Sequence, residues 1–239
     1  MLMRLAKAIK RGFRGIGKRG YTLMEVAAVV AVSATLAAVA LPVVTDKTNE
    51  GKVVAGKQDC QNIGNAIATF YKDTGIWPAF NGTSPTAVTT AVPYTGTVYT
   101  YQILRTGSDL THDPKALAGV TWSAVGGATD ALQNHLVVDK PGGSTPNGYR
   151  TYGFNWKGPY IDTLADKRDP WGNNYLVYVA GMYTPSSNIS GTLVAYVPKI
   201  YGWVISAGPN GILETEITKD QPQGDDVGLV LFSFEKPKG

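Results

Sequence analysis

The chain has few of the side chains that enzymes use for covalent or metal-assisted chemistry. Its 239 residues include one cysteine and two histidines, His112 and His135. The histidines have neither paired spacing nor an accompanying catalytic motif, and the 28 glycines do not form a phosphate-binding loop. We therefore expect both histidines to lie on the surface of a loop-rich domain. These absences predict that the protein is not an enzyme.

The single cysteine excludes an intramolecular disulfide. Cys60 falls at helical spacing with Ile63, Ile67 and Phe70. This pattern predicts a small buried hydrophobic residue rather than a nucleophile. Long loops must therefore be held by something other than a disulfide.

Acidic residues are absent from residues 1–20, which carry seven basic ones. The net charge of +4 comes from this stretch, since the remainder carries a net charge of −3, so it does not indicate nucleic-acid binding. Residues 26–44 then carry no charge. As a helix they span about 28 Å, close to the roughly 30 Å of a bilayer core. Basic residues beside an apolar segment mark the cytoplasmic side.

One carboxylate, Glu25, stands at the start of this uncharged segment. An acid within a membrane helix costs up to about 3.5 kcal/mol at the bilayer centre, less near its edge, and usually marks a functional position. Helical spacing continues beyond the segment, so we expect one helix from Thr22 to Asp73, ended by Gly75 and Pro78. Pro42 should kink it.

Beyond this helix the pattern changes to strands. Tyr99, Tyr101 and Ile103 alternate with polar residues, and turn residues separate the later candidates. These candidates are Tyr175 to Ala180, Leu193 to Val197, Tyr201 to Ser206 and Val227 to Phe234. Short connections favour an antiparallel sheet. We therefore predict an α+β fold, with a long N-terminal helix packed on an antiparallel sheet; residues 106–148 show no clear period.

Residues 20–25, Gly-Tyr-Thr-Leu-Met-Glu after a basic run, resemble the type IV pilin and pseudopilin family. The resemblance implies that a prepilin peptidase cuts between Gly20 and Tyr21 and that the new amine at Tyr21 is N-methylated. It implies that Glu25 faces the N-terminus of a neighbouring subunit in a filament. It also suggests that the helix loosens near Pro42 when subunits pack.

Two further blocks make the chain similar to the major pseudopilin of type II secretion. Residues 66–78 match that family's helix end followed by an aromatic residue and proline. Residues 169–175 begin with Asp-Pro-Trp-Gly, a turn in which Pro170 fixes the backbone and Trp171 offers an apolar face to the core.

A third block, residues 206–211 with 224–227, resembles the loop in which those pseudopilins bind calcium. Adjacent acids repel each other, and a hard cation that takes six to eight oxygen ligands would neutralise them. Asp225 and Asp226 are the leading candidate ligands, with Asn210 as a third. The alternative is a solvated acidic loop without metal.

The resemblance implies a leader at residues 1–20, a helix at 21–74, and a periplasmic head at 75–239 with an enlarged insertion near 80–160. The protein would pass once through the inner membrane and polymerise with itself, aided by the prepilin peptidase, an assembly platform and minor pseudopilins. It would act as a pseudopilus subunit in protein export, with no nucleic-acid partner. The same polymer could instead be a type IV pilus for adhesion, motility or DNA uptake.

A reading of another class is a secretory signal peptide. Ala38-Val39-Ala40 fits a small-residue cleavage site, which would release a soluble protein starting at Leu41. Aromatic residues could then bind sugar or another ligand, although aromatics beside turns are more often core residues. The candidates are Trp77, Trp122, Trp156 and Trp203.

Overall fold

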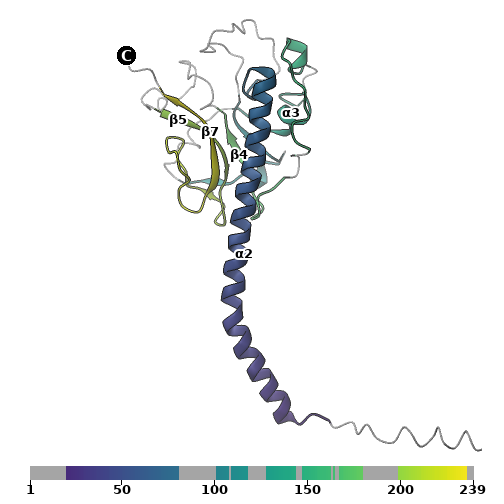
Figure 1. Cartoon of the computed structure of the whole chain (residues 1–239), viewed down its shortest axis with the longest axis vertical. Helices are drawn as coiled ribbons and strands as arrows, with labels where there is room; N and C mark the ends of the chain where they lie inside the picture. Colours follow the sequence, from purple (N-terminus) through teal and green to yellow (C-terminus); the bar gives the residue numbers. More distant parts are fainter. Residues whose placement is uncertain are drawn as a thin grey trace, which may run out of the picture. The chain divides into compact units, whose positions relative to one another are not determined.

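A computed structural model describes residues 20–80, 101–107, 109–117, 128–143, 147–162, 164, 167–179 and 199–235. The chain divides into two compact units, Met1–Asn49 and Glu50–Gly239, the second of which we call the head. Helix α2, Leu23–Thr74, contributes to both units (Figure 1). The expected helix is thus confirmed to within one residue at each end.

Helix α2 ends where the sequence predicts. Gly75 adopts the left-handed conformation (φ 73°), and its N–H donates to the carbonyl of Tyr71 at 2.8 Å. A glycine just after the last helical turn accepts this conformation without steric cost. The backbone stays helical through residue 42, and the kink at Pro42 stays a prediction.

The first half of α2 is apolar and uncovered. Its large side chains, including Val29, Leu36 and Val39, are exposed along the whole stretch. Among the described residues, α2 is the helix that is long and apolar enough to cross a membrane. This finding agrees with a single-pass anchor.

The head contains a five-stranded sheet in the order β3-β1-β4-β5-β7. Its strands are β1 (Tyr101–Arg105), β3 (Ala128–Ala131), β4 (Leu176–Tyr178), β5 (Lys199–Ser206) and β7 (Val227–Glu235). Four of them confirm strand candidates from the sequence. The candidate at 193–197 and residue Tyr99 lie outside the described residues.

The sheet is mostly antiparallel, with one exception. Three pairings, β1 with β4, β4 with β5 and β5 with β7, are antiparallel, whereas β1 and β3 are parallel. Parallel neighbours need a long crossover connection rather than a tight hairpin, and here it lies in the stretch without a clear sequence period. A small second sheet pairs β2 (Lys115–Ala116) with β6 (Ile212–Leu213). The remaining elements are α3 (Gln133–Leu136), η1 (Leu110–His112) and η2 (Arg150–Tyr152).

The main core lies between the second half of α2 and this sheet (Figure 1). The predicted helical stripe of Ile63, Ile67 and Phe70 is fully or almost fully buried. Gly64 lets the helix approach the sheet closely, because a Cβ there would lie only 2.8 Å from two leucines of β7. A Cβ on Gly56 would lie 3.5 Å from the Trp171 ring, which is an ordinary van der Waals distance. Close packing therefore explains Gly64.

Cys60 is fully buried, and its Sγ lies 3.6 Å from the carbonyl oxygen of Val227. Burial, with the nearby carboxylates Asp59 and Asp169, raises the pKa of the Cys60 thiol to about 12. We expect Cys60 in the native protein to react with a maleimide more than about a hundredfold more slowly than in urea, because the thiolate is the reactive form. Mass spectrometry of timed samples would measure this. Equal rates in the two conditions would contradict the burial.

The histidines differ in their environment. His112 is exposed, as expected, and its Nδ1 lies 2.8 Å from Asp109 Oδ2. The expectation for His135 is wrong, because it is completely buried. It lies on α3, within the stretch whose structure the sequence did not reveal, and its two ring nitrogens contact Asp130 and Tyr149.

Candidate functional site

The proposed cleavage point lies on exposed, non-helical chain. Gly20 and Tyr21 are exposed, Tyr21 to 83%, and both precede the first residue of α2. No heavy atom lies within 4 Å of the position that a Cβ of Gly20 would occupy, leaving out its own chain neighbours. The Gly20–Tyr21 peptide bond is therefore accessible in the described part of the chain.

Glu25 forms a capping box with Thr22. The N–H and Oγ1 of Thr22 lie 2.9 and 3.0 Å from Glu25 Oε2, and the Glu25 N–H lies 3.2 Å from Thr22 Oγ1. This reciprocal pair satisfies free donors in the first helical turn. The spacing Thr-x-x-Glu is a local capping-box signal that is already present in the sequence.

The capping box fixes the carboxylate at the first turn of an uncovered apolar helix. Within the described part of the chain, Oε1 of Glu25 accepts no hydrogen bond. This arrangement leaves one carboxylate oxygen available to a cation that approaches the end of the helix. The sequence-based expectation of a partner for Glu25 is compatible with this geometry.

The Asp-Pro-Trp-Gly block is a structural turn. Asp169 Oδ1 accepts from the N–H groups of Trp171 (3.0 Å) and Asn173 (2.8 Å), and Gly172 has a φ of 99°. The Ser206 hydroxyl donates to Asp169 Oδ2 at 2.6 Å. The turn therefore ties the second sequence block to Ser206, the first residue of the third.

The third block brings Asp225 and Asp226 together with Glu214. Asp226 Oδ2 accepts from the N–H groups of Glu214 (2.9 Å) and Thr215 (2.6 Å). Glu214 Oε2 in turn accepts from the Asp225 N–H at 3.1 Å. Three carboxylates thus close the loop between β6 and β7. Glu214 carried no local sequence signal, because it lies eleven positions before Asp225 in the chain.

Burial disfavours the ionised forms of both aspartates in this loop. Burial and the carboxylate of Glu214 raise the pKa of Asp225, and burial raises that of Asp226 despite three hydrogen bonds to the Asp226 carboxylate. Within the described residues, the Oδ1 atoms of Asp225 and Asp226 are both buried without a hydrogen-bond partner. Unpaired, buried carboxylate oxygens are suited to a hard cation.

The rest of a calcium ligand set is not assembled in this arrangement. Asn210 is adjacent, because its N–H donates to Asp225 Oδ2 at 3.0 Å, but its side-chain oxygen accepts from the Ile212 N–H at 2.6 Å. Among the described residues, no three acidic, histidine or cysteine side chains are placed to hold a metal ion. Calcium therefore stays a prediction that rests on two carboxylates.

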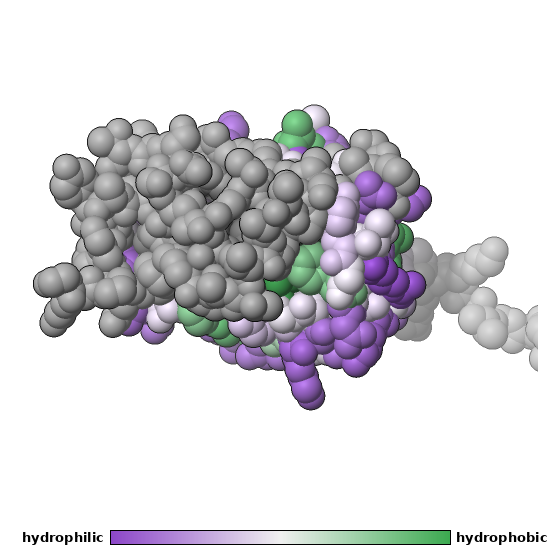
Figure 2. Space-filling view, turned by 90° about the horizontal axis from the view of Figure 1, so that it is seen from above, coloured by the Kyte–Doolittle hydropathy of each residue, from purple (hydrophilic) through white to green (hydrophobic). Residues whose placement is uncertain are grey.

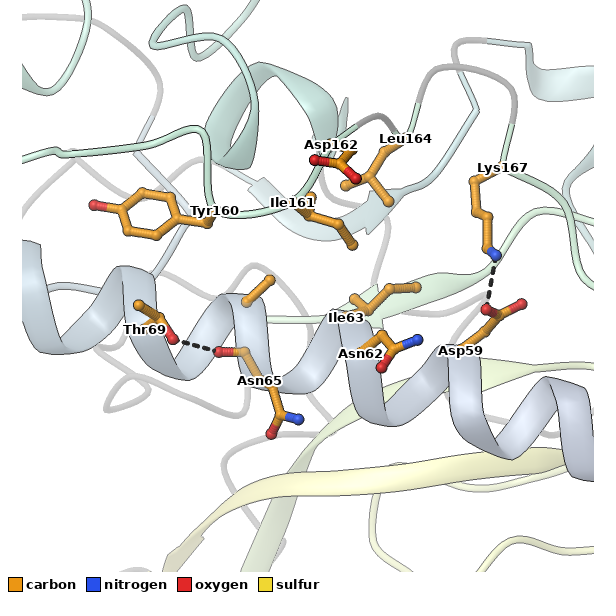
Figure 3. A pocket seen from close by; sticks show the side chains of 11 residues that line it. Asp59, Asn62, Ile63, Asn65, Thr69, Tyr160, Ile161, Asp162, Leu164 and Lys167 are labelled. Atoms are coloured by element: carbon orange, nitrogen blue, oxygen red, sulfur yellow. Dashed lines mark hydrogen bonds and ion pairs between the residues drawn. The ribbon is translucent and has the colours of Figure 1, made fainter.

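A groove of about 500 Å³ lies between α2 and residues 160–162, 164 and 167 (Figure 3). Ile63, Ile161 and Leu164 form its apolar centre. The Lys167 Nζ closes one end by pairing with Asp59 at 2.7 Å. The residues that line it include no nucleophile beside a base, so it does not suggest an active site.

A buried chain of hydrogen bonds connects Asp130, His135 and Tyr149. His135 Nε2 lies 3.0 Å from Asp130 Oδ2, and Nδ1 lies 2.5 Å from the Tyr149 hydroxyl. Burial alone would raise the pKa of Asp130, but hydrogen bonds from His135 and two other donors lower it overall. The Tyr149 side chain is fully buried and packs on Phe70. Because the Tyr149 hydroxyl is buried, no substrate can reach it. This series of hydrogen bonds is therefore structural.

Two of the four tryptophans proposed as a binding surface are buried in the described part of the chain. Trp156 and Trp203 are buried, and Trp122 lies outside the described residues. Trp77 is partly buried and stacks on Tyr71. These positions remove two of the four aromatic residues on which a soluble carbohydrate-binding protein would rely.

Two known proteins are similar to part of this chain. Fimbrial protein EcpC of Eikenella corrodens is 34% identical over 86 residues, which cover 34% of this chain and 53% of that protein. Type IV major pilin protein PilE of Neisseria gonorrhoeae is 32% identical over 75 residues, covering 31% of this chain and 45% of that protein. The chain thus spans about half the length of these relatives. No family model matches, and no solved structure matches.

The long apolar helix and the antiparallel-rich sheet define a pilin-like α+β fold. The two relatives support a type IV pilin-like family. They do not single out the pseudopilin of type II secretion.

Proposed function

We propose that this protein is a membrane-anchored subunit that polymerises into a filament through α2. One observation carries the proposal: the first half of α2 is apolar and exposed throughout, and it starts at a capped carboxylate, Glu25. A soluble protein would not require an exposed apolar helix of this kind. A membrane or a bundle of identical helices would cover it.

Processing would prepare the subunit for assembly. A prepilin peptidase would hydrolyse the exposed Gly20–Tyr21 bond, and methylation of the new Tyr21 amine would keep its positive charge. The amine then lies four residues before Glu25, at the same end of the helix. An acid and an amine at equivalent positions can pair between copies that are shifted along the filament axis.

Assembly would exchange lipid for neighbouring helices. Lipid chains are as apolar as Leu or Val, so helix association in a membrane depends on close packing and on polar contacts. Glu25 supplies the polar contact, because a carboxylate in an apolar environment is costly until it is paired. The pairing would select the axial position of the incoming subunit.

We favour a pseudopilus of type II secretion over a type IV pilus because of the sequence blocks at 66–78, 169–175 and 206–227. The pseudopilus would act mechanically and help drive protein export. The named relatives, fimbrial and pilus proteins, support the pilus reading. Loss of secreted proteins without loss of surface filaments in a deletion strain would distinguish the first role from the second.

The mature N-terminus tests the proposal. We expect protein purified from the membranes of a bacterium that contains a prepilin peptidase to begin at Tyr21 and to carry one added methyl group, as intact-mass and peptide mass spectrometry would show. Gly20→Val is the control, since a bulky residue beside the scissile bond should leave the leader attached. Mature protein that begins at Leu41 would overturn the proposal, because α2 would then lose its apolar half.

We also propose that the loop between Asn210 and Asp226 binds calcium. The buried, unpaired Oδ1 atoms of Asp225 and Asp226 support this proposal, and Glu214 adds a third nearby carboxylate. The ion would replace a disulfide as the device that holds this long loop. Removal of calcium would then loosen the head but leave α2 helical.

A further inference from the structure

Two asparagines of the head share one tripeptide, Pro-Asn-Gly. Residues 146–148 and residues 209–211 both have this sequence. An asparagine followed by glycine is the pair most prone to deamidation, because glycine has no side chain to shield its nitrogen. The third Asn-Gly pair, at residues 81–82, lies outside the described residues. Because the two tripeptides are identical, a difference in their reactivity must come from the fold.

The pair Asn210–Gly211 lies in the turn between β5 and β6. Asn210 is exposed, and Gly211 adopts the left-handed conformation (φ 67°). The Gly211 N–H donates to the Gly208 carbonyl at 3.3 Å, which is longer than an ordinary hydrogen bond between these groups. The Gly211 nitrogen is therefore held loosely, at a position that solvent can reach.

The side chain of Asn210 is held close to this nitrogen. Its Oδ1 accepts from the Ile212 N–H at 2.6 Å. This hydrogen bond closes a ring that contains the Gly211 nitrogen, so it folds Cγ of Asn210 back towards the main chain. The same N–H would stabilise the negative charge that develops on Oδ1 when a nucleophile attacks Cγ. The turn thus holds an electrophile beside a nucleophile and also polarises it.

The pair Asn147–Gly148 is held in a different way. Asn147 is half-buried, and its Nδ2 donates to the Tyr152 hydroxyl at 3.1 Å. Gly148 is buried, and a Cβ on it would collide with Asp139. The Asp139 carboxylate also accepts from the N–H groups of residues 149 and 150. These contacts fix the backbone that would have to rotate before the Gly148 nitrogen could reach the Asn147 side chain.

We propose that Asn210 is a site of spontaneous deamidation in the folded protein and that Asn147 is protected. The Gly211 nitrogen loses its proton to solvent and attacks Asn210 Cγ. The new C–N bond closes a cyclic imide, and the amide nitrogen takes up a proton and leaves as ammonia. Water then opens the imide at either carbonyl, which leaves aspartate or isoaspartate at position 210. Water is the co-reactant, and Figure 2 shows strongly hydrophilic side chains on the described surface of the head.

The reaction would add a carboxylate to the loop that already holds Glu214, Asp225 and Asp226. The Asn210 N–H donates to Asp225 Oδ2 at 3.0 Å, so the new charge arises beside an existing one, and like charges disfavour each other. Isoaspartate also lengthens the main chain next to Gly211, whose carbonyl accepts from the Lys115 N–H at 3.1 Å beside the β2–β6 pairing. Both products should therefore destabilise the head as the protein ages.

Timed peptide mass spectrometry of the full chain tests this proposal, in detergent at neutral pH and physiological temperature. In the native protein, Asn210 should be converted at least about tenfold faster than Asn147, because only Asn210 is held in a reactive geometry. In urea the two sites should react at equal rates, since they share one tripeptide. Equal rates in the native protein, or conversion of Asn210 in urea but not in the native protein, would overturn the proposal.

Two variants test the effect on the head. Asn210→Asp reproduces one product and should melt below the wild type in a chelator at neutral pH. Asn210→Ser is the control, since its hydroxyl can still accept from Ile212 but has no amide to lose. On incubation, the wild type should develop a lower-melting fraction, whereas Asn210→Ser should keep its melting temperature. An equal loss of melting temperature in Asn210→Ser would show that ageing of the head does not depend on Asn210.

Discussion

Replacing Glu25 by Gln is expected to abolish filaments while leaving the amount of protein in the membrane unchanged. Gln at this position can still accept from Thr22, so the capping box and the start of α2 should persist. What is lost is the charge that pairs with the amine of a neighbour. Removing one partner of a buried ion pair typically costs about 3–5 kcal/mol. We therefore expect more than about a tenfold drop in filaments, counted by electron microscopy.

Thr22→Ala provides the matched control for Glu25→Gln. It removes the cap and keeps the carboxylate. If pairing between subunits is the function of Glu25, Thr22→Ala should retain most filaments. Loss of filaments in Thr22→Ala with normal filaments in Glu25→Gln would show that the cap, and not the charge, matters.

Replacing Asp225 by Asn is expected to have opposite effects with and without calcium. The raised pKa of Asp225 means that its ionised form destabilises the folded head at pH 7. This cost decreases as the pH falls through the raised pKa towards the ordinary value of 3.8. In a chelator, the variant should therefore melt above the wild type at pH 7, and this difference should vanish in acid.

With calcium, the order should reverse. A cation at a hundred times its Kd stabilises the folded form by about 2.7 kcal/mol, which corresponds to a Tm rise of about 5–10 °C for a domain of this size. Asp225→Asn should lose most of this rise. Tryptophan fluorescence in detergent would measure the melting temperature.

Asp220→Asn is the control for the calcium experiment, since it removes an exposed acid from the same loop. It should melt like the wild type in both conditions. Asp226→Ala is less informative, because it also removes the acceptor of two backbone N–H groups and should destabilise the head even in a chelator. A wild-type melting temperature that does not respond to calcium would remove the metal proposal.

Local sequence patterns predicted the features that depend on neighbouring residues. The bounds of α2 follow from apolar spacing and Gly75, and the burial of Cys60 follows from the helical stripe. The strands β5 and β7 follow from their runs of β-branched and aromatic residues. Each of these signals lies within about ten residues of the element it specifies.

Features that depend on contacts between distant residues were not predictable in this way. The parallel pairing of β1 with β3, the burial of His135 and the approach of Glu214 to Asp225 all require the tertiary fold. From the sequence alone, His135 is predicted to be a surface residue. Only the tertiary structure shows that Asp130 and Tyr149 contact its buried ring. The capping partner Thr22 was a local signal, and it could have been found.

Because α2 is synthesised before β7, the core between these two elements stays incomplete for part of the synthesis of the chain. The stripe that contains Phe70 is synthesised about 160 residues before Leu229 and Leu231, which pack against the same core. At about 5–20 residues per second, roughly 10–30 s pass between the synthesis of the stripe and the synthesis of these two leucines. A nascent chain that stalls before β7 would therefore expose the apolar stripe of α2 to chaperones and proteases. Cellular quality control can detect an incomplete subunit by this exposed stripe.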